Sequence, residues 1–270
     1  MTRIALVVSD VDGTLLTGDK TLTEGAKSAV RRLRDAGIGF TITSSRPTVG
    51  MRFLIEPLAI ALPIGSFNGS CIVDPQLNPI EQHLIPASAA ARSLGIFDAF
   101  GVDVWLFTNN LWLARRSDSE YVAGEMRAIK SAPTVVGDFS PYLPAACKIV
   151  GASSDAALLQ HCEAAMQEAL GTQAIAVKSQ GFYLDITPPG CDKGTFVRAM
   201  AKRLGVSTDA VATIGDMHND LAMFRASGIS IAMGNATGDV KEQATHVTTS
   251  NEDEGFAEAI EMILRNNAAG

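Results

Sequence analysis

Two aspartates near the start of the chain have the type and spacing of a cation-binding pair. Asp10 and Asp12 follow an apolar run, Ile4 to Val8, and stand two residues apart. At the end of a strand, this spacing lets both side chains point toward one space. Two close carboxylates repel each other unless a cation or a raised pKa relieves them. Asp216, after a second apolar run at 211–214, would add a third oxygen ligand and so complete a site suited to Mg²⁺.

Such a site could cleave a phosphate ester. If the metal holds Asp10 ionised, its carboxylate can attack phosphorus and form an aspartyl-phosphate. Asp12 could protonate the leaving oxygen and then take a proton from water. Lys193 would offset negative charge on Asp10 and on the phosphoryl group, and Ser44 would donate a hydrogen bond to that group. Gly13 would let the backbone turn closely around the phosphate.

Each aspartate taken alone is more simply explained as a cap of a helix or turn. Their combination favours chemistry, because all of these polar clusters stand where apolar strands of one sheet are expected to end. In open α/β sheets, sites form at the carboxyl ends of the strands, where the strand order reverses. We therefore treat four residues as one predicted site: Asp10, Asp12, Lys193 and Asp216.

Strand and helix signals alternate in the two outer parts of the chain. Apolar runs predict strands at 4–8, 39–43, 63–67, 211–214, 229–232 and 246–247. Helical spacing predicts helices from 26 to Gly37, at 193–204, from 220 and at 255–264. Repeated β-α-β units of this kind form a parallel sheet with helices on both faces.

The middle of the chain has a different pattern. Helices are expected near 87–100, 119–131 and 155–169, and strands at 104–107, 111–115, 148–152, 175–178 and 182–186. Asn109-Asn110 is the expected turn of a hairpin, and tight turns between strands favour an antiparallel α+β unit. We therefore predict an α/β fold, with a Rossmann-like core at 1–83 and 189–270 and an inserted α+β cap at 84–188.

Composition narrows the possible partners and location. The chain has 270 residues, 47% of them hydrophobic and 19% charged, which is enough apolar material for a substantial core. A net charge of -7 argues against a nucleic-acid partner, because phosphate backbones bind clustered Lys and Arg. The four cysteines form no CxxC pair, and no segment is apolar for long enough to export or anchor the chain. We expect a soluble cytoplasmic protein, either a monomer or a homodimer.

The polar clusters, in their order, also resemble a known family. Asp10-Val11-Asp12-Gly13-Thr14 comes first, then Ser44 followed by Arg46, then Lys193 in Asp-Lys-Gly, then Gly215-Asp216-Met217-His218-Asn219-Asp220. This series resembles the haloacid dehalogenase (HAD) superfamily and, within it, the Cof-like phosphatases. The similarity continues through 232–236 and 247–251.

The resemblance implies a Mg²⁺-dependent phosphatase with Asp10 as nucleophile and Asp12 as general acid and base. It implies that Asp10, the carbonyl of Asp12 and Asp216 bind the metal, with support from Asn219 and Asp220. The candidate phosphate-binding residues are Gly13, Ser44, Ser45, Arg46, Lys193 and Asn219, with Asn68 and Gly69 as supporting loop residues. The sequence departs from the family at Ser44-Ser45-Arg46, usually Thr-Gly-Arg, and at Glu252-Asp253-Glu254-Gly255, usually Glu-Asp-Gly. Ser45 could therefore share the role of Ser44, and the second departure predicts an altered loop.

Family analogy ranks phosphosugars first as substrates, with phosphorylated cofactors such as pyridoxal phosphate and flavin mononucleotide behind. The substrate would then be a small phosphate ester, selected by a hinged cap. Two alternatives stay open: a sugar phosphomutase or phosphotransferase with the same intermediate, and a non-catalytic phosphate-binding module. We expect no catalytic role for His218 and Cys191, and packing roles for Trp105 and Trp112.

Overall fold

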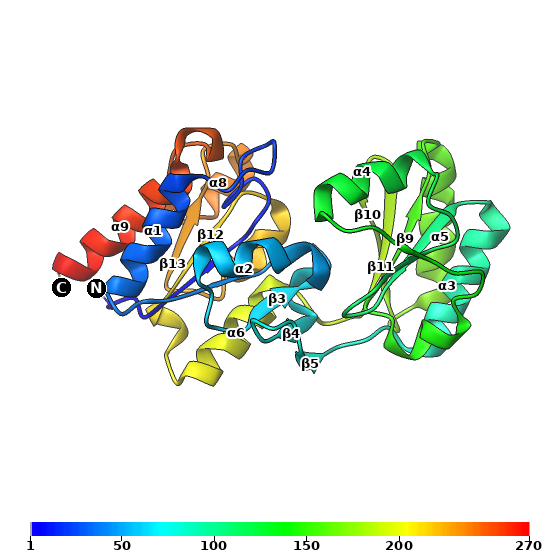
Figure 1. The fold of residues 1–270 in the computed structure, drawn as a ribbon, viewed down its shortest axis with the longest axis horizontal. Helices are drawn as coiled ribbons and strands as arrows, with labels where there is room; N and C mark the ends of the chain where they lie inside the picture. Colours follow the sequence, from blue (N-terminus) through cyan, green and yellow to red (C-terminus); the bar gives the residue numbers. More distant parts are fainter. Residues whose placement is uncertain (1, 270) are drawn as a thin grey trace. The chain divides into compact units, whose positions relative to one another are not determined.

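The computed structural model describes residues 2–269, in two compact units that differ in architecture (Figure 1). The core unit comprises Met1–Arg46, Met51–Ile80 and Cys191–Gly270, and the inserted unit comprises Pro47–Gly50 and Glu81–Gly190. Sequence patterns did not anticipate that Pro47–Gly50 groups with the inserted unit. The domain limits expected at 83/84 and 188/189 remain a prediction. Among the described residues, no helix is long and apolar enough to cross a membrane.

A five-stranded sheet lies at the centre of the core unit, and every pair of neighbouring strands in it is parallel, as predicted. Its order is β14 (His246–Val247), β13 (Ile229–Ala232), β12 (Val211–Gly215), β1 (Leu6–Ser9) and β2 (Gly39–Ile42). From β1 the chain continues to β2 on one side and later returns to β12 on the other. The strand order therefore reverses at the carboxyl end of β1, immediately before Asp10.

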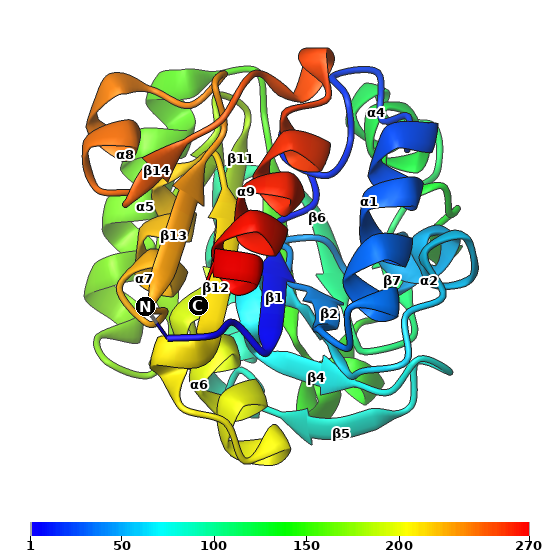
Figure 2. The ribbon, with the colours of Figure 1, turned by 90° about the vertical axis from the view of Figure 1, so that its left-hand side faces the viewer.

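Helices cover both faces of this sheet (Figure 2). One face packs on α1 (Glu24–Asp35) and α9 (Gly255–Ala269), and the other on α6 (Lys193–Leu204) and α7 (Leu221–Phe224). The start of α1 follows from Thr23, whose hydroxyl accepts the Ala26 N–H at 3.0 Å. Beyond its end, Gly37 has a φ of 72°, a conformation that glycine adopts at little cost. Two short helices, α2 (Arg52–Leu58) and α8 (Gly238–Glu242), complete the unit.

The third strand, predicted at 63–67 as part of the parallel sheet, differs from expectation. Strand β3 (Ile64–Ser66) pairs antiparallel with β4 (Cys71–Val73), in a three-stranded sheet that ends with β5 (Pro79–Gln82). A single parallel bridge, Thr43 to Gly65, links it to the end of β2. The cause is the turn at 67–69, where three consecutive residues have positive φ and the chain reverses.

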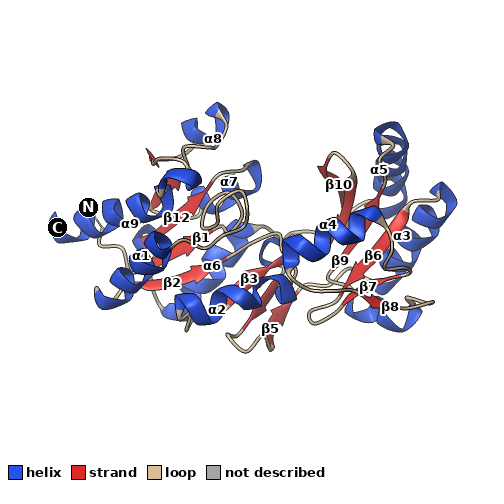
Figure 3. Cartoon of the chain, turned by 45° about the horizontal axis from the view of Figure 1, so that its top comes forward, coloured by secondary structure: helices blue, strands red, loops and turns tan. Residues whose placement is uncertain are grey.

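The inserted unit is a mainly antiparallel α+β layer structure, as predicted (Figure 3). Its sheet order is β10 (Ile175–Gln180), β11 (Tyr183–Thr187), β9 (Lys148–Ala152), β6 (Asp103–Phe107), β7 (Trp112–Ala114) and β8 (Thr134–Val135). Helices α3 (Ala87–Phe100) and α5 (Ala156–Leu170) bury one face of this sheet. On the other face, α4 (Glu120–Ile129) brings the Tyr121 ring against Tyr183. Strand β8, which pairs parallel with β7, was not anticipated.

Candidate active site

The carboxyl ends of three adjacent core strands bring predicted site residues together. Asp10 follows β1, Ser44 lies just beyond the end of β2, and Asp216 follows β12. Lys193 is the first residue of α6, whose start is capped by Asp192 accepting the Thr195 N–H at 2.7 Å. The side chains of Asp10, Ser44, Lys193 and Asp216 are all buried. The sheet topology therefore brings three of the four predicted residues, Asp10, Lys193 and Asp216, to one edge of the sheet, whereas the side chain of Asp12 makes other contacts.

Lys193 joins two acidic side chains inside this cluster. Its Nζ lies 2.5 Å from Oδ1 of Asp10 and 2.5 Å from Oδ1 of Asp220. The other oxygen of Asp220 accepts the backbone N–H groups of Asp216 and Met217, both at 2.9 Å. Both oxygens of Asp220 are therefore engaged, and Asp220 orients Lys193 and the loop that carries Asp216.

The cluster carries more negative than positive charge. Oxygens of Asp10, Asp216 and Asp220 all lie within 4.8 Å of one another. Burial raises the pKa of Asp10 to about 8, against the opposing charge of Lys193. Burial, reinforced by the charge of Asp220, raises the pKa of Asp216 to about 6. Burial disfavours the ammonium of Lys193, but the charges of Asp10 and Asp220 outweigh it and raise the pKa of that lysine. A cation bound between these carboxylates would offset their repulsion and favour their ionised form.

The side chain of Asp216 is held by two donors that sequence reasoning did not select. Thr14 donates its hydroxyl to Oδ1 at 3.1 Å, and the Asn235 amide donates to Oδ2 at 3.3 Å. Gly13, with a φ of 76°, lies so close that a methyl group added there would meet the Asp216 carboxylate. The signals for both donors were present in the sequence, in Asp-Gly-Thr and in the similarity over 232–236.

Asp12 lies in a separate ion-pair network with two cations. Arg46 contacts it through both ends of its guanidinium, Nε to Oδ2 at 2.6 Å and Nη2 to Oδ1 at 2.8 Å. Lys20, which sequence reasoning missed, lies 2.8 Å from Oδ1. Burial opposes ionisation, but the hydrogen bonds and charges of Arg46 and Lys20 outweigh it and lower the pKa of Asp12. These contacts therefore favour the carboxylate form of Asp12.

The remaining predicted residues line the neighbouring loops. Ser44 is buried and its hydroxyl oxygen accepts the Arg46 N–H at 3.2 Å, which leaves its own hydrogen free to donate. Ser45 is exposed. Asn219 is exposed and donates to Oδ1 of Asn68 at 3.1 Å. Gly69 has a φ of 86° and lies against Phe196, so that its role is in the turn.

Residues for which no catalytic role was expected lie in other surroundings. His218 is exposed and pairs with Asp239. Trp105 and Trp112 are buried in the inserted unit, with their rings 5.4 Å apart. Cys191 is partly exposed.

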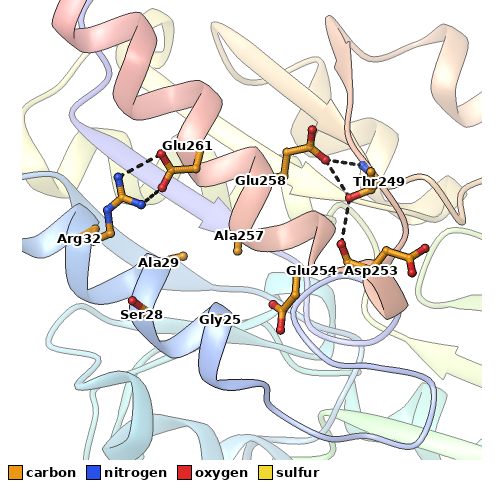
Figure 4. Close-up of a pocket in the computed structure, with 10 residues that line it drawn as sticks. All are labelled: Gly25, Ser28, Ala29, Arg32, Thr249, Asp253, Glu254, Ala257, Glu258 and Glu261. Atoms are coloured by element: carbon orange, nitrogen blue, oxygen red, sulfur yellow. Dashed lines mark hydrogen bonds and ion pairs between the residues drawn. The ribbon is translucent and has the colours of Figure 1, made fainter.

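A hollow of about 470 Å³ lies elsewhere on the core unit, between α1 and α9 (Figure 4). Its polar walls are largely paired with each other: Arg32 with Glu261, and Glu258 with Thr249. None of the predicted site residues lines it. We therefore separate this hollow from the candidate active site.

Known proteins match the chain over nearly its whole length. Residues 7–260 match the model of the haloacid dehalogenase-like hydrolases. A 5-amino-6-(5-phospho-D-ribitylamino)uracil phosphatase of Bacillus subtilis is 27% identical, over 96% of this chain and 97% of the relative. An HMP-PP phosphatase of Cronobacter sakazakii is 28% identical, over 88% of this chain and 87% of the relative. The crystal structure of a haloacid dehalogenase-like hydrolase from Bacteroides thetaiotaomicron superimposes with a TM-score of 0.91 at 27% identity, covering 97% of this chain and all of that one.

Proposed function

Because the chain belongs to the haloacid dehalogenase-like hydrolases, we propose that it hydrolyses small phosphate monoesters with Mg²⁺, through an aspartyl-phosphate on Asp10. The observation that carries this proposal is the buried cluster of Asp10, Lys193, Asp216 and Asp220 at the carboxyl end of β1. Burying several carboxylates and a lysine together destabilises a fold. Such clusters of perturbed ionisable groups are therefore typical of active sites.

The donor set of the cluster fits a hard divalent cation. The cluster contains three carboxylates and one ammonium, and Asp220 spends both oxygens on Lys193 and on backbone N–H groups. As the family resemblance implies, Asp10 and Asp216 are the side chains that would hold Mg²⁺, with the carbonyl of Asp12 as the third ligand and Asp220 in support through Lys193. The bound ion would supply positive charge that keeps Asp10 ionised and balances the phosphoryl oxygens.

The proposed reaction has two steps on the residues of this chain. First, the Asp10 carboxylate forms a bond to phosphorus while the bond from phosphorus to the ester oxygen breaks, and Asp12 gives that oxygen a proton. Water then attacks the same phosphorus, Asp12 takes the proton of the water, and the acyl-phosphate bond to Asp10 breaks. Lys193 and Ser44 would stabilise the charge on the phosphoryl group in both steps.

The ion pairs of Asp12 set a condition for the first step. Arg46 and Lys20 hold Asp12 as a carboxylate, the form needed to accept a proton from water. To act as an acid, Asp12 must first gain a proton, which these two cations oppose. A substrate phosphate competes for the same cations, so its arrival would weaken their hold on Asp12.

The substrate class rests on similarity. The two phosphatases named above act on a phosphorylated ribityl compound and on HMP-PP. We propose that the substrate of this chain is also a small phosphorylated metabolite, and phosphosugars are the first compounds to test.

The experiment measures phosphate release from a panel of sugar phosphates, phosphorylated cofactors and the substrates of those two relatives, with Mg²⁺ or with EDTA. Wild type should release phosphate only with Mg²⁺, and Asp10→Asn should lower kcat by more than about 1000-fold. Acid quenching of the wild type should trap phosphate on the protein. Release that persists in Asp10→Asn would show that Asp10 is not the nucleophile.

A bisphosphorylated sugar separates hydrolysis from transfer. A phosphatase releases inorganic phosphate from it, whereas a phosphomutase moves phosphate between sugar positions. Transfer without release would replace the proposed hydrolysis by phosphoryl transfer at the same aspartate.

A further inference from the structure

Two asparagines, Asn235 and Asn251, lie outside the four polar clusters that predicted the site and connect parts of it. Asn235 follows β13, in the stretch 232–236 whose similarity to the family had no assigned role. Its side-chain amide donates to the carbonyl of Gly13 at 2.9 Å and, at the longer distance of 3.3 Å, to Oδ2 of Asp216. One side chain thus touches both the loop after β1 and the proposed metal ligand after β12.

Asn251 fixes which way that amide points. The backbone N–H of Asn251 donates to Oδ1 of Asn235 at 3.0 Å. Because a backbone N–H can only donate, Oδ1 must face it, and the NH₂ group must face Gly13 and Asp216. The side chain of Asn251 in turn donates to the carbonyl of Leu16 at 2.9 Å.

The altered segment after Asn251 adds further ties to the same loop. Glu252 accepts the backbone N–H of Gly18 at 2.6 Å. Glu254 accepts the hydroxyl of Thr23, the residue that caps α1, at 2.9 Å. The segment 251–254 therefore holds the loop between β1 and α1 at three points along its length, at Leu16, Gly18 and Thr23.

From these contacts we propose that Asn235 is a positioning residue of the metal site, oriented by Asn251. Thr14 holds one oxygen of Asp216 and Asn235 reaches the other, so that together they set the rotation of this carboxylate. By binding Gly13 as well, Asn235 sets the separation between Asp216 and the loop that carries Asp10. This proposal rests on the proposed Mg²⁺ site, because it assigns Asn235 the role of arranging the ligands of that ion.

The exposure of Asn235 separates this role from a role in folding. The residue is exposed, so its truncation opens no cavity in the core. A purely structural asparagine at this place would change stability a little and Mg²⁺ binding not at all.

The test measures the dissociation constant of Mg²⁺ alone by titration calorimetry, without substrate, and the unfolding temperature of the metal-free protein. Asn235→Ala should weaken Mg²⁺ binding by about 10- to 100-fold, the usual effect of losing a group that orients metal ligands. Its metal-free unfolding temperature should stay close to that of wild type. Asn251→Ala keeps the backbone N–H and should weaken Mg²⁺ binding less.

Asn78→Ala is the matched control. Asn78 is also an exposed asparagine of the core unit that donates to a carboxylate, Asp74, at 3.0 Å, and its loss should leave the dissociation constant unchanged. Wild-type affinity in Asn235→Ala, or a loss no larger than in Asn78→Ala, would overturn the proposal. If wild type itself bound no Mg²⁺, the proposed function would fail instead, and the two failures are thus distinct.

Discussion

The ammonium of Lys193 lies 2.5 Å from the carboxylate of Asp10, although 183 positions separate the two residues in the chain. The contact requires β1 and α6 to converge, and so it depends on both sequence segments that flank the inserted unit. Lys193 also lies 2.5 Å from Asp220, so that this one ammonium serves two buried carboxylates.

Replacement of Lys193 by Met should damage both activity and folding. The substitution leaves Asp10 and Asp220 buried without their cation. Because removing one partner of a buried ion pair leaves an uncompensated charge, the free energy of unfolding should fall by about 3–5 kcal/mol. The loss of a charge that faces the phosphoryl group should lower kcat by at least about 100-fold. Phosphate release and urea unfolding measure the two effects. Lys202→Met, at an exposed position of the same helix, should change neither.

Stability of the metal-free protein should fall as pH rises. The pKa of Asp10 is raised from 3.8 to about 8 and that of Asp216 from 3.8 to about 6, mainly by burial. Between about pH 4 and 8 the folded chain therefore binds more protons than the unfolded chain, so the free energy of unfolding decreases as these protons leave. The stabilising contribution of protonated Asp216 is lost as pH rises through about 6, and that of protonated Asp10 is lost as pH rises through about 8.

Urea unfolding in EDTA at pH 6, 7 and 8 measures this trend. Asp10→Asn cannot ionise at that position, so its stability should depend less on pH than that of wild type. Equal slopes for the two proteins would contradict the raised pKa of Asp10. Added Mg²⁺ should stabilise wild type more at pH 8 than at pH 6, since a bound cation competes with protons for the same oxygens.

Much of this arrangement could be predicted because parallel strands bring their carboxyl ends to one edge. Apolar runs before Asp10 and Asp216 indicated the strands, and β-α-β alternation indicated that the strands are parallel. The position of Lys193 at a helix start followed from Asp192-Lys193-Gly194. Local patterns therefore contained enough information for the sheet and for the side chains at its edge.

Contacts that depend on loop conformation could not be predicted from such patterns. Nothing in the spacing of Lys20 or Arg46 indicates that both contact Asp12, because loop conformation and not strand register brings them there. The same holds for Asn235, whose role depends on the loop at Asn251. The reversal after β3 was also missed, since positive φ at Phe67 is unusual for a bulky side chain.

Replacement of Arg46 by Met should shift the pH dependence of kcat upward. Arg46 lowers the pKa of Asp12 against the effect of burial, so its removal lets Asp12 keep its proton to higher pH. Both limbs of the profile should then move toward higher pH, because Asp12 is proposed as acid in one step and as base in the other. The loss of kcat should be greater at pH 6 than at pH 8. Arg52→Met, at an exposed position in α2, is the control, and a profile that does not move would rule out this link.

The inserted unit contains a buried ion pair of its own. Lys148 and Asp185 lie 2.6 Å apart on neighbouring strands β9 and β11, with only 15% and 9% of their side chains exposed. Lys148→Met should destabilise the protein by about 3 kcal/mol, because Asp185 is left as an unpaired buried charge. The double variant Lys148→Met with Asp185→Leu should recover most of that loss.

Thermal and urea unfolding measure the difference in stability between Lys148→Met and the double variant. Arg116→Met removes an exposed pair with Asp118 in the same unit and should leave the unfolding midpoint unchanged. If the double variant were as unstable as Lys148→Met, packing and not the unpaired charge would be the cause.

Replacement of Gly13 by Ala should disturb the metal site beyond the strain that it adds to the backbone. Gly13 has a φ of 76°, and an added methyl group would press against the carboxylate of Asp216. Gly37 offers a matched comparison, because its φ is 72° and an added methyl group there meets nothing within 4 Å. Both substitutions carry a similar backbone cost, of about 1–2 kcal/mol.

The two variants should therefore lose similar stability but differ at the site. Gly37→Ala should keep the wild-type kcat and Mg²⁺ affinity, since only its backbone is strained. Gly13→Ala should lower Mg²⁺ affinity by about 10-fold or more, because Asp216 must turn away from Thr14 and Asn235 to make room. Titration calorimetry with Mg²⁺ and urea unfolding of both variants make the comparison. Equal Mg²⁺ affinity in the two would mean that the Asp216 carboxylate can move without loss, and that its two donors do not set its position.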